Sequence, residues 1–294
     1  MHATPQQPLR YAVGLPNRRE YADPRLLRDL GVLAERSGWD GFFLWDGQVA
    51  EHPDEHLTDS WTTLAAVAAG TERLRLGVMV NVLALKRPAE VARATVALDL
   101  LSGGRLVFGA GLGSSPAEFE ALGEDPDPRV RAEKLDEALQ VLEGLWTGRP
   151  FTFHGRWFTV TDLTFQPVSP QRPRIPVWIA GTWPSRRPMR RAARWDGVFP
   201  TRAGVGHTEM MPPADLEAVV AYVRAQQAVR KGRFDVVMEG RTSGLRRDED
   251  ARVVAPYRAA GLTWWVEKLG WFRGPVDLVR TRIGSGPPRP ADTA

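Results

Sequence analysis

The run LLSGGRLVFGAGLGS at residues 100–114 constrains the fold of this chain more than any other stretch. It joins the end of a leucine-rich helix to a glycine pair, and glycine can adopt the left-handed backbone that terminates a helix. The segment RLVFGA that follows is a nearly continuous apolar strand, and Gly111 and Gly113 leave space beyond its carboxyl end. This order is typical of an α/β barrel, in which the functional site lies at the carboxyl ends of the strands.

Apolar strands alternate with amphipathic helices along the whole chain, a pattern that requires a parallel sheet with right-handed crossovers. Strands are expected at Tyr11–Leu15, Gly41–Trp45, Leu74–Val82, Arg105–Ala110, Val177–Ala180, Gly197–Pro200, Phe234–Glu239 and Thr263–Glu267. Helices are expected at Pro24–Arg36, Ser60–Gly70, Pro88–Leu101, Arg129–Thr147, Arg187–Arg194, Ala214–Arg230 and Ala251–Ala260. Roughly eight strand–helix units have the size of a TIM (β/α)₈ barrel.

One segment interrupts the repeat. From Gly148 to Pro176 the chain is aromatic and proline-rich, which predicts a hairpin or an irregular crossover inserted into one barrel domain with its core at about residues 9–284. The first few residues and the tail at 287–294 are expected to be disordered. An open doubly wound sheet is the rival architecture, but Gly109-x-Gly111-x-x-Ser114 departs from the dinucleotide fingerprint at its last position.

Composition limits the chemistry. Hydrophobic residues make up 43% and charged residues 25% of the chain, which suits a large globular core. With Cys 0 there is no disulfide, thiolate metal site or cysteine nucleophile. The five histidines are scattered rather than set at metal-ligand spacing, so we expect no metal site.

Charge and hydropathy exclude two classes of partner. The net charge of +4 comes from arginines that are spread among Asp and Glu, which argues against nucleic-acid binding. No early segment resembles a secretion signal and no apolar run is long enough to span a bilayer. We therefore expect a cytoplasmic protein with no membrane partner.

The segment AGTWPSRR at residues 180–187 leaves a strand and opens a helix, so free amides, the positive helix end and arginine converge. This predicts a phosphate site. The candidate binding residues are Gly181, Thr182, Trp183, Ser185, Arg186 and Arg187. A solvated basic helix with a Ser or Thr cap is the alternative. Arg190, Arg191 and Arg194, later in the same helix, are expected to be external.

Three separated blocks of the sequence resemble the bacterial luciferase-like, or LLM-class, flavin-dependent oxidoreductases and monooxygenases. They are SGWDGFFLWD at 37–46, the long run from TERLRLGVMV to GAGLG at 71–113, and IPVWIAG with RRAARWDGVFP within 175–200. The resemblance covers nearly the whole chain. It implies a TIM barrel with an insertion, a flavin or deazaflavin bound at the carboxyl ends of the strands, and redox chemistry on that cofactor.

The resemblance also implies a cofactor slot. Met79–Val80 would be a non-prolyl cis peptide that makes a bulge behind the central ring, while an ordinary buried strand pair is the alternative. Asn81 would be a hydrogen-bond partner of the ring edge or a turn-capping residue. Gly111 and Gly113 would form a tight turn with room for a planar ligand.

Candidate catalytic groups lie near the expected barrel mouth. Asp46 ends a strand, and many relatives place a histidine directly after it, but this chain has Gly47. His52 or His56 on the following loop could reach inward in its place, although a histidine in such a loop is more often exposed to solvent.

Two further carboxylates, Glu239 and Glu267, end strands and are expected to face the mouth as general acid or base, or to be solvated or helix-capping groups. Glu118 is another candidate or a helix cap. Trp264, Trp265 and Trp271 are expected to wall the mouth, with only one of the adjacent tryptophans able to face it.

Three functions follow from these expectations. The leading one is a two-component monooxygenase that uses reduced FMN from a partner reductase to insert one oxygen atom into a small organic substrate. The alternative is a hydride-transfer oxidoreductase that uses the deazaflavin coenzyme F420, and a third is a non-catalytic subunit that binds flavin poorly. The family implies a homodimer in contact through its first helices. The insertion and the loop at 203–213 are where we expect a mobile lid and substrate selectivity.

Overall fold

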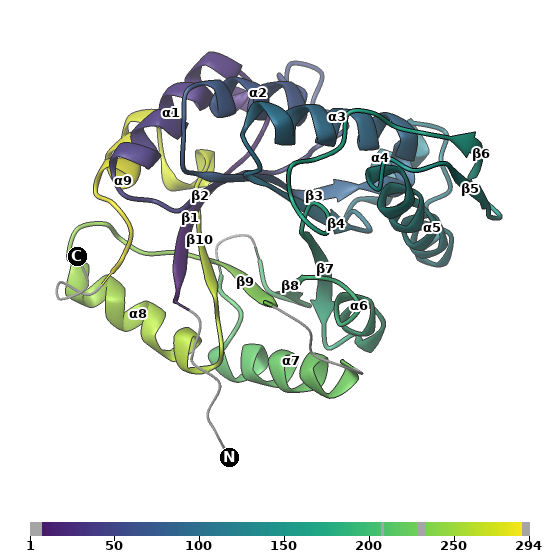
Figure 1. The fold of residues 1–294 in the computed structure, drawn as a ribbon. Coiled ribbons are helices and arrows are strands. Elements are labelled where there is room, and N and C mark those ends of the chain that lie inside the picture. Colours follow the sequence, from purple (N-terminus) through teal and green to yellow (C-terminus); the bar gives the residue numbers. More distant parts are fainter. Residues whose placement is uncertain (1–7, 207–208, 228–232, 290–294) are drawn as a thin grey trace.

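The computed structural model describes residues 8–206, 209–227 and 233–289, and within them eight parallel strands close into a barrel that helices surround (Figure 1). The strand order around the barrel is β1-β10-β9-β8-β7-β4-β3-β2. Because β1 pairs with both β2 and β10, the sheet has no free edge. The TIM barrel is therefore confirmed and the open doubly wound sheet is excluded.

The observed elements follow the predicted alternation closely. The barrel strands are β1 (Arg10–Leu15), β2 (Gly41–Leu44), β3 (Arg75–Val82), β4 (Leu106–Gly111), β7 (Val177–Trp183), β8 (Gly197–Arg202), β9 (Asp235–Gly240) and β10 (Trp264–Lys268). The α-helices are α1 (Pro24–Arg36), α2 (Ser60–Ala69), α3 (Pro88–Leu101), α4 (Pro116–Ala121), α5 (Pro128–Trp146), α6 (Arg186–Ala192), α7 (Pro213–Gln226), α8 (Arg247–Ala259) and α9 (Val276–Gly284). Single 3-10 turns are η1 (Arg19–Tyr21), η2 (Leu83–Leu85) and η3 (Trp271–Arg273).

The two helices that the pattern did not predict, α4 and α9, are short and lie in loop-like sequence. α9 completes the ring of helices and packs against α1. The end of the helix expected at Ala214–Arg230 and part of the loop expected as a lid lie outside the described residues, as do the first seven residues and positions 290–294.

The insertion is the hairpin that its composition predicted. β5 (Phe151–His154) and β6 (Thr159–Leu163) pair antiparallel, and Figure 1 shows them beside α5 at the edge of the molecule. The start of the tail is ordered, because Arg289 donates to the Asp40 carboxylate at 2.6 Å.

A cluster of three aromatic rings fills the barrel near the beginnings of the strands. The ring centroids of Phe43, Trp178 and Trp264 lie 5.5 to 5.8 Å from one another. Gly197 makes room for this cluster, because a Cβ there would stand 2.5 Å from Trp178 Cδ1. The plug closes the barrel at that level and leaves the carboxyl ends of the strands as the open side.

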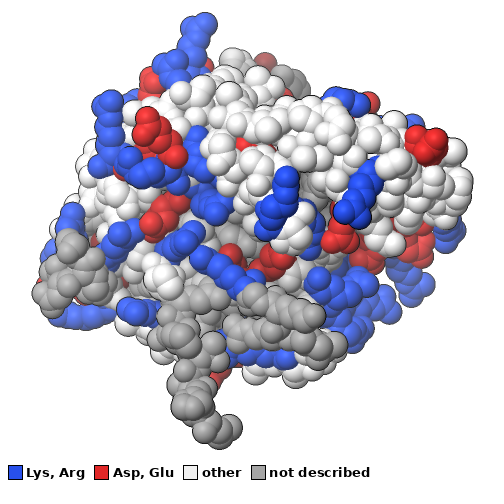
Figure 2. Space-filling view, viewed as in Figure 1, with Lys and Arg blue, Asp and Glu red and all other residues white. Residues whose placement is uncertain are grey.

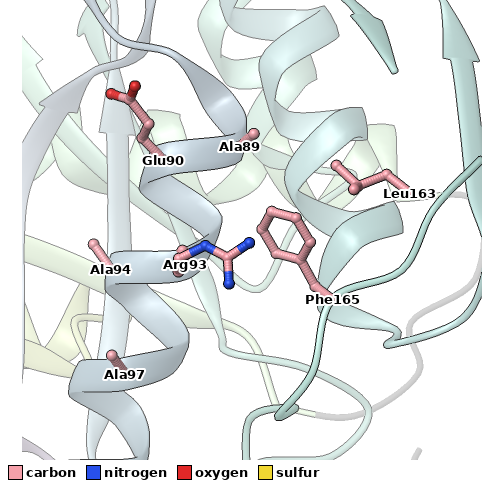
Figure 3. Close-up of a pocket in the computed structure, with 7 residues that line it drawn as sticks. All are labelled: Ala89, Glu90, Arg93, Ala94, Ala97, Leu163 and Phe165. Atoms are coloured by element: carbon pink, nitrogen blue, oxygen red, sulfur yellow. The ribbon is translucent and has the colours of Figure 1, made fainter. Parts of the chain in front are cut away.

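A small hollow of about 540 Å³ lies outside the barrel, between α3 and the segment that follows β6 (Figure 3). Most of its lining is apolar, with the Arg93 guanidinium 4.4 Å from the centroid of the Phe165 ring. Its lining residues lack the converging polar groups of a catalytic site, so we place the candidate active site elsewhere.

In the described part of the chain, no helix combines the length and apolar character that crossing a membrane requires.

Candidate active site

A cleft of about 1500 Å³ opens at the carboxyl ends of the barrel strands. Its walls come from the strand ends, the loops that follow them and the facing sides of α5 and α6. The predicted site residues that line it are Asp46, Met79, Val80, Gly111, Gly113, Gly181, Thr182, Ser185, Arg187 and Glu239. The fold therefore brings these residues together at one cleft from five of the barrel's strand–loop units, as expected for this architecture.

The floor of the cleft contains a backbone irregularity in β3. The Met79–Val80 peptide bond is cis, as the family resemblance implied, and the pairing of β3 with β4 shifts register between Val78 and Asn81. Both Met79 and Val80 line the cleft. Gly111 accommodates this bulge, because a Cβ at that position would stand 2.6 Å from Val80 Cγ2.

Asn81 does not reach the cleft. Its side chain is fully buried, and Nδ2 donates to the Gly109 carbonyl at 2.8 Å. The expectation that Asn81 contacts the ring edge is therefore wrong for this structure, because the bulge carries the side chain away from the cleft and into contact with the β4 backbone.

Asp46 is a buried carboxylate at the end of β2 and is paired with a lysine. Lys86 Nζ lies 2.6 Å from Asp46 Oδ2. Asp46 also lines the cleft, so it combines access to a ligand with a charge-assisted hydrogen bond from Lys86.

Arg18 occupies the space beside Gly47. Its guanidinium is buried, pairs with Glu51 and donates to the Val49 carbonyl at 3.0 Å. This position therefore presents a guanidinium at the cleft, since Arg18 is also one of the lining residues. His52 and His56 do not replace the missing histidine: both are exposed and neither lines the cleft.

Glu239 at the end of β9 has two polar partners that also line the cleft. Trp45 Nε1 donates to Glu239 Oε1 at 3.0 Å, and Lys268 Nζ lies 2.9 Å from Oε2. The Lys268 ammonium also lies 5.2 Å from the centroid of the Trp45 ring. Trp45 and Lys268 thus hold the Glu239 carboxylate in a defined position at the cleft.

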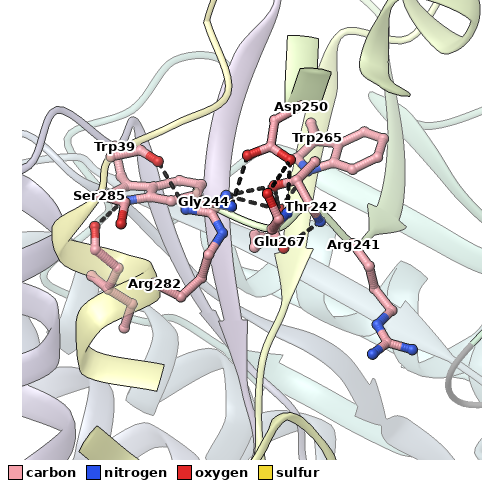
Figure 4. Close-up of polar contacts among 12 residues, drawn as sticks. Trp39, Arg241, Thr242, Gly244, Asp250, Trp265, Glu267, Arg282 and Ser285 are labelled. Atoms are coloured by element: carbon pink, nitrogen blue, oxygen red, sulfur yellow. Dashed lines mark hydrogen bonds and ion pairs between the residues drawn. The ribbon is translucent and has the colours of Figure 1, made fainter. Parts of the chain in front are cut away.

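Glu267 does not face the barrel mouth as expected. Its side chain is 0% exposed and accepts hydrogen bonds from Thr242 N and Thr242 Oγ1, both at 2.7 Å, on the helix side of β10 (Figure 4). Arg273 and Arg282 form ion pairs with it at 3.4 and 3.2 Å. Burial lowers the pKa of the Arg273 guanidinium, and the Glu267 carboxylate opposes that shift. Glu267 is a structural charge rather than a group of the cleft.

The tryptophans of β10 follow the same alternation. Trp264 points into the aromatic plug below the cleft, and Trp265 points outward and donates to Glu267 Oε2 at 3.1 Å. Neither lines the cleft, so the expectation that one of this pair walls the mouth is wrong. Trp271 does line it. The carboxylate of Glu118 is at the cleft as well, where it accepts a hydrogen bond from Gln48 N at 3.0 Å.

The candidate phosphate segment divides into two groups. Thr182, Ser185 and Arg187 line the cleft, and the Thr182 hydroxyl lies 3.1 Å from that of Thr201. Trp183 and Arg186 turn away: the Arg186 guanidinium lies 4.9 Å from the Trp183 ring and 4.4 Å from the Tyr222 ring, against α7. The binding roles expected for these two residues are therefore not supported by their positions.

Of the arginines later in α6 and just after it, Arg190 and Arg194 are exposed as expected, whereas Arg191 is not. Arg190, Arg191 and Arg194 line the cleft, and Arg191 is buried with its Nε 2.6 Å from Asp136 Oδ1. In Figure 2, basic side chains gather at the position of α6, while acidic and basic side chains are interspersed over the rest of the visible face. In the ranges that the structure describes, no cluster of His, Asp and Glu has the arrangement of a metal site.

An eight-stranded barrel with a large polar cleft at the carboxyl ends of its strands defines an α/β-barrel enzyme. The chain belongs to the luciferase-like monooxygenase family, whose sequence pattern matches residues 5–279. It is therefore an enzyme of a luciferase-like oxidoreductase family.

Three proteins illustrate what this chain is similar to in sequence and in structure. The chain is 31% identical to an F420-dependent glucose-6-phosphate dehydrogenase of Microbacterium testaceum (strain StLB037), over 93% of this chain and 79% of that protein. An F420-dependent secondary alcohol dehydrogenase in complex with an F420-acetone adduct has a TM-score of 0.77 at 15% identity, over 95% of this chain and 97% of that one. Monooxygenase RslO1 from Streptomyces bottropensis has a TM-score of 0.73 at 19% identity, over 94% and 98%.

Proposed function

We propose that this chain is a coenzyme F420-dependent oxidoreductase that interconverts an alcohol and a carbonyl compound by hydride transfer. The observation that carries the proposal is the 31% identity, over most of the chain, to a protein named as an F420-dependent dehydrogenase. We therefore prefer the F420-dependent oxidoreductase, which was the alternative in the sequence analysis, to the FMN-dependent monooxygenase, which was the leading hypothesis there. The cofactor and the alcohol–carbonyl chemistry are inferred from similar dehydrogenases, and the residues that handle the proton are inferred from the cleft.

The residues at the cleft suit a cofactor of this type. Met79 and Val80 offer an apolar surface at the bulge of β3, against which a planar ring would lie. Thr182, Ser185 and Arg187 would hold a phosphate group at the edge of the same cleft. The cleft of about 1500 Å³ is larger than the ~300–1000 Å³ of common ligand pockets, so it has room for a cofactor and a substrate together.

When bound, the deazaflavin supplies a two-electron centre that accepts or donates hydride. The protein must then handle the accompanying proton. In the oxidation direction, Glu239 would accept the hydroxyl proton of an alcohol whose carbon gives up a hydride and becomes a carbonyl. Lys268 and Trp45 orient the Glu239 carboxylate toward the cleft. Asp46, held by Lys86, is the second carboxylate within reach of the cleft.

The test is a binding titration followed by a variant. Apoprotein is titrated separately with F420 and with FMN in both redox states, with ligand fluorescence and melting temperature as readouts. We expect F420 to bind and stabilise the protein more strongly than FMN. Tight binding of reduced FMN alone would instead favour the monooxygenase, which agrees with the description of the family, and binding of neither would favour a non-catalytic subunit.

Glu239→Gln then tests the proton-transfer role. With F420 bound and an alcohol that the wild type oxidises, we expect the rate of cofactor reduction to fall by about 10²–10⁴-fold while F420 affinity is retained. Glu217→Gln on the exposed side of α7 is the matched control. An unchanged rate in Glu239→Gln would move the proton-transfer role to Asp46.

A further inference from the structure

Arg131 is a buried arginine in the wall of the cleft. It lies in the second turn of α5, its side chain is 8% exposed, and it is among the lining residues. Its guanidinium makes few contacts: Nη1 donates a long hydrogen bond of 3.3 Å to the Gly113 carbonyl, and the group lies 4.8 Å from the Phe119 ring. Its Nε is buried without a hydrogen-bond partner.

The other buried cations of the cleft each have a carboxylate. Arg18 pairs with Glu51, Arg191 is bound through two nitrogens to Asp136, and Lys268 pairs with Glu239. Among the described residues, no carboxylate lies within ion-pair distance of Arg131. Burial accordingly lowers the pKa of its guanidinium, with Asp127 opposing the shift.

A buried cation without an anion destabilises the folded chain, so its presence calls for a partner that arrives from outside. The surroundings favour an anion. Ser114 and Ser115 bring hydroxyl groups to the same wall, and α5 directs the positive end of its dipole toward this side.

We propose that Arg131 binds a phosphate oxyanion of the ligand that occupies the cleft. This position lies on the β4–α5 wall, apart from the residues of β7 and α6 to which the sequence assigned a phosphate. The proposal rests on the proposed function only for the identity of the ligand. The phosphate could belong to the cofactor as a phosphoester or to a phosphorylated substrate, and the experiments separate the two sources.

Arg131→Met keeps an unbranched side chain with an apolar stem but removes the guanidinium and its charge. If Arg131 is present for a ligand, the ligand-free variant should melt at the same temperature as the wild type or higher, because an unpaired buried cation has been removed. Inorganic phosphate should raise the melting temperature of the wild type and of Arg131→Lys by more than it raises that of Arg131→Met, whose remaining response would come from the separate group of Thr182, Ser185 and Arg187. Arg129→Met, an exposed neighbour at the cleft, should retain the response to phosphate.

The source of the phosphate is found by comparing matched ligand pairs. The first pair is F420 and the deazaflavin riboside that lacks its phosphoester, and the second is glucose 6-phosphate and glucose. One of the two pairs contains the ligand whose phosphate contacts Arg131. In that pair, we expect Arg131→Met to lower the affinity for the phosphorylated ligand by roughly ten- to hundredfold and to leave the affinity for the unphosphorylated ligand unchanged.

Two results would overturn the proposal. One is a wild type whose melting temperature does not respond to phosphate. The other is an Arg131→Met variant that is less stable than the wild type without ligand and that binds phosphorylated and unphosphorylated ligands with equally reduced affinity. Those two effects together would identify a structural arginine. If FMN binds instead of F420 and its advantage over riboflavin depends on Arg131, the proposal stands and only the cofactor of the proposed function changes.

Discussion

The guanidinium of Arg18 lies directly beside Gly47: a Cβ at residue 47 would stand 2.8 Å from Arg18 Nη2 and 3.3 Å from Cζ. The two residues come from the ends of different barrel strands, and Arg18 is held in place by Glu51 and the Val49 carbonyl. The position where the family resemblance implies a histidine is therefore closed to any side chain while Arg18 keeps this conformation.

Gly47→Ala should lower the free energy of unfolding by about 1–3 kcal/mol, because the added Cβ displaces a guanidinium that other contacts hold. Chemical denaturation measures this loss. Gly284→Ala at the end of α9 is the control, since its Cβ would meet nothing within 4 Å. In an Arg18→Ala background the cost of Gly47→Ala should shrink, and additive costs in that double-mutant cycle would show that the two residues do not interact.

Glu267→Gln should destabilise the protein by about 3–5 kcal/mol, because it leaves the buried guanidinium groups of Arg273 and Arg282 without a carboxylate. Glu239→Gln on the adjacent strand should cost about 1–2 kcal/mol, since Glu239 is partly exposed at the cleft. Denaturation midpoints of the two variants test the ranking. Equal losses would contradict the distinction between a structural and a cleft carboxylate.

The contribution of Glu35 to stability should depend on pH. Burial alone would raise the pKa of Glu35, but hydrogen bonds from the backbone N–H groups of Arg73, Glu72 and Leu74 outweigh it and hold the pKa below its usual value. The ionised carboxylate therefore stabilises the folded state above the pKa of the unfolded chain, and this stabilisation is lost as pH falls through the lower pKa of the folded state. Glu35→Gln should be less stable than wild type at pH 7, and the gap should close in acid. For the control Glu217→Gln, we expect no such change with pH in the difference in stability from the wild type.

Gly197→Ala should destabilise the barrel core by about 1–3 kcal/mol. Its Cβ would stand 2.5 Å from Trp178 Cδ1 and 2.8 Å from the Asp235 carbonyl oxygen, and a closed barrel gives the backbone little room to move. Trp178→Phe, which shortens the ring that is contacted, should recover part of this loss in the double variant. Urea midpoints would measure the recovery, and its absence would assign the cost to the Asp235 backbone contact alone.

Much of the barrel could be predicted because its signals are local. The boundaries of α1 and α3 were predicted to the residue, since apolar periodicity and an N-terminal proline mark both. The cis peptide at Met79–Val80 came from the family resemblance and is confirmed. α9 was missed because a short helix after the last strand carries little periodicity of its own.

The errors at the site concern the direction in which side chains point. Glu267 and Lys268 are adjacent on β10, and a strand sends neighbouring residues to opposite faces. Because Trp264 points inward, the period of two places Lys268 inward and Glu267 outward. That signal could have identified Lys268 in advance, had the face of Trp264 been known. Arg191 and Arg131 gave no such signal, since their burial depends on how α5 and α6 pack.

The sequence by itself determined the order of strands and helices, the hairpin insertion and the family, because each depends on residues that are close together in the chain. Only the tertiary structure decided which charges meet at the cleft: Trp45 with Glu239 and Lys268, Arg18 over Gly47, and Arg131 with no carboxylate. Barrel closure brings these residues together from strands and helices that are far apart in sequence. Whether a charge is paired or left for a ligand is therefore a property of packing that no local pattern records.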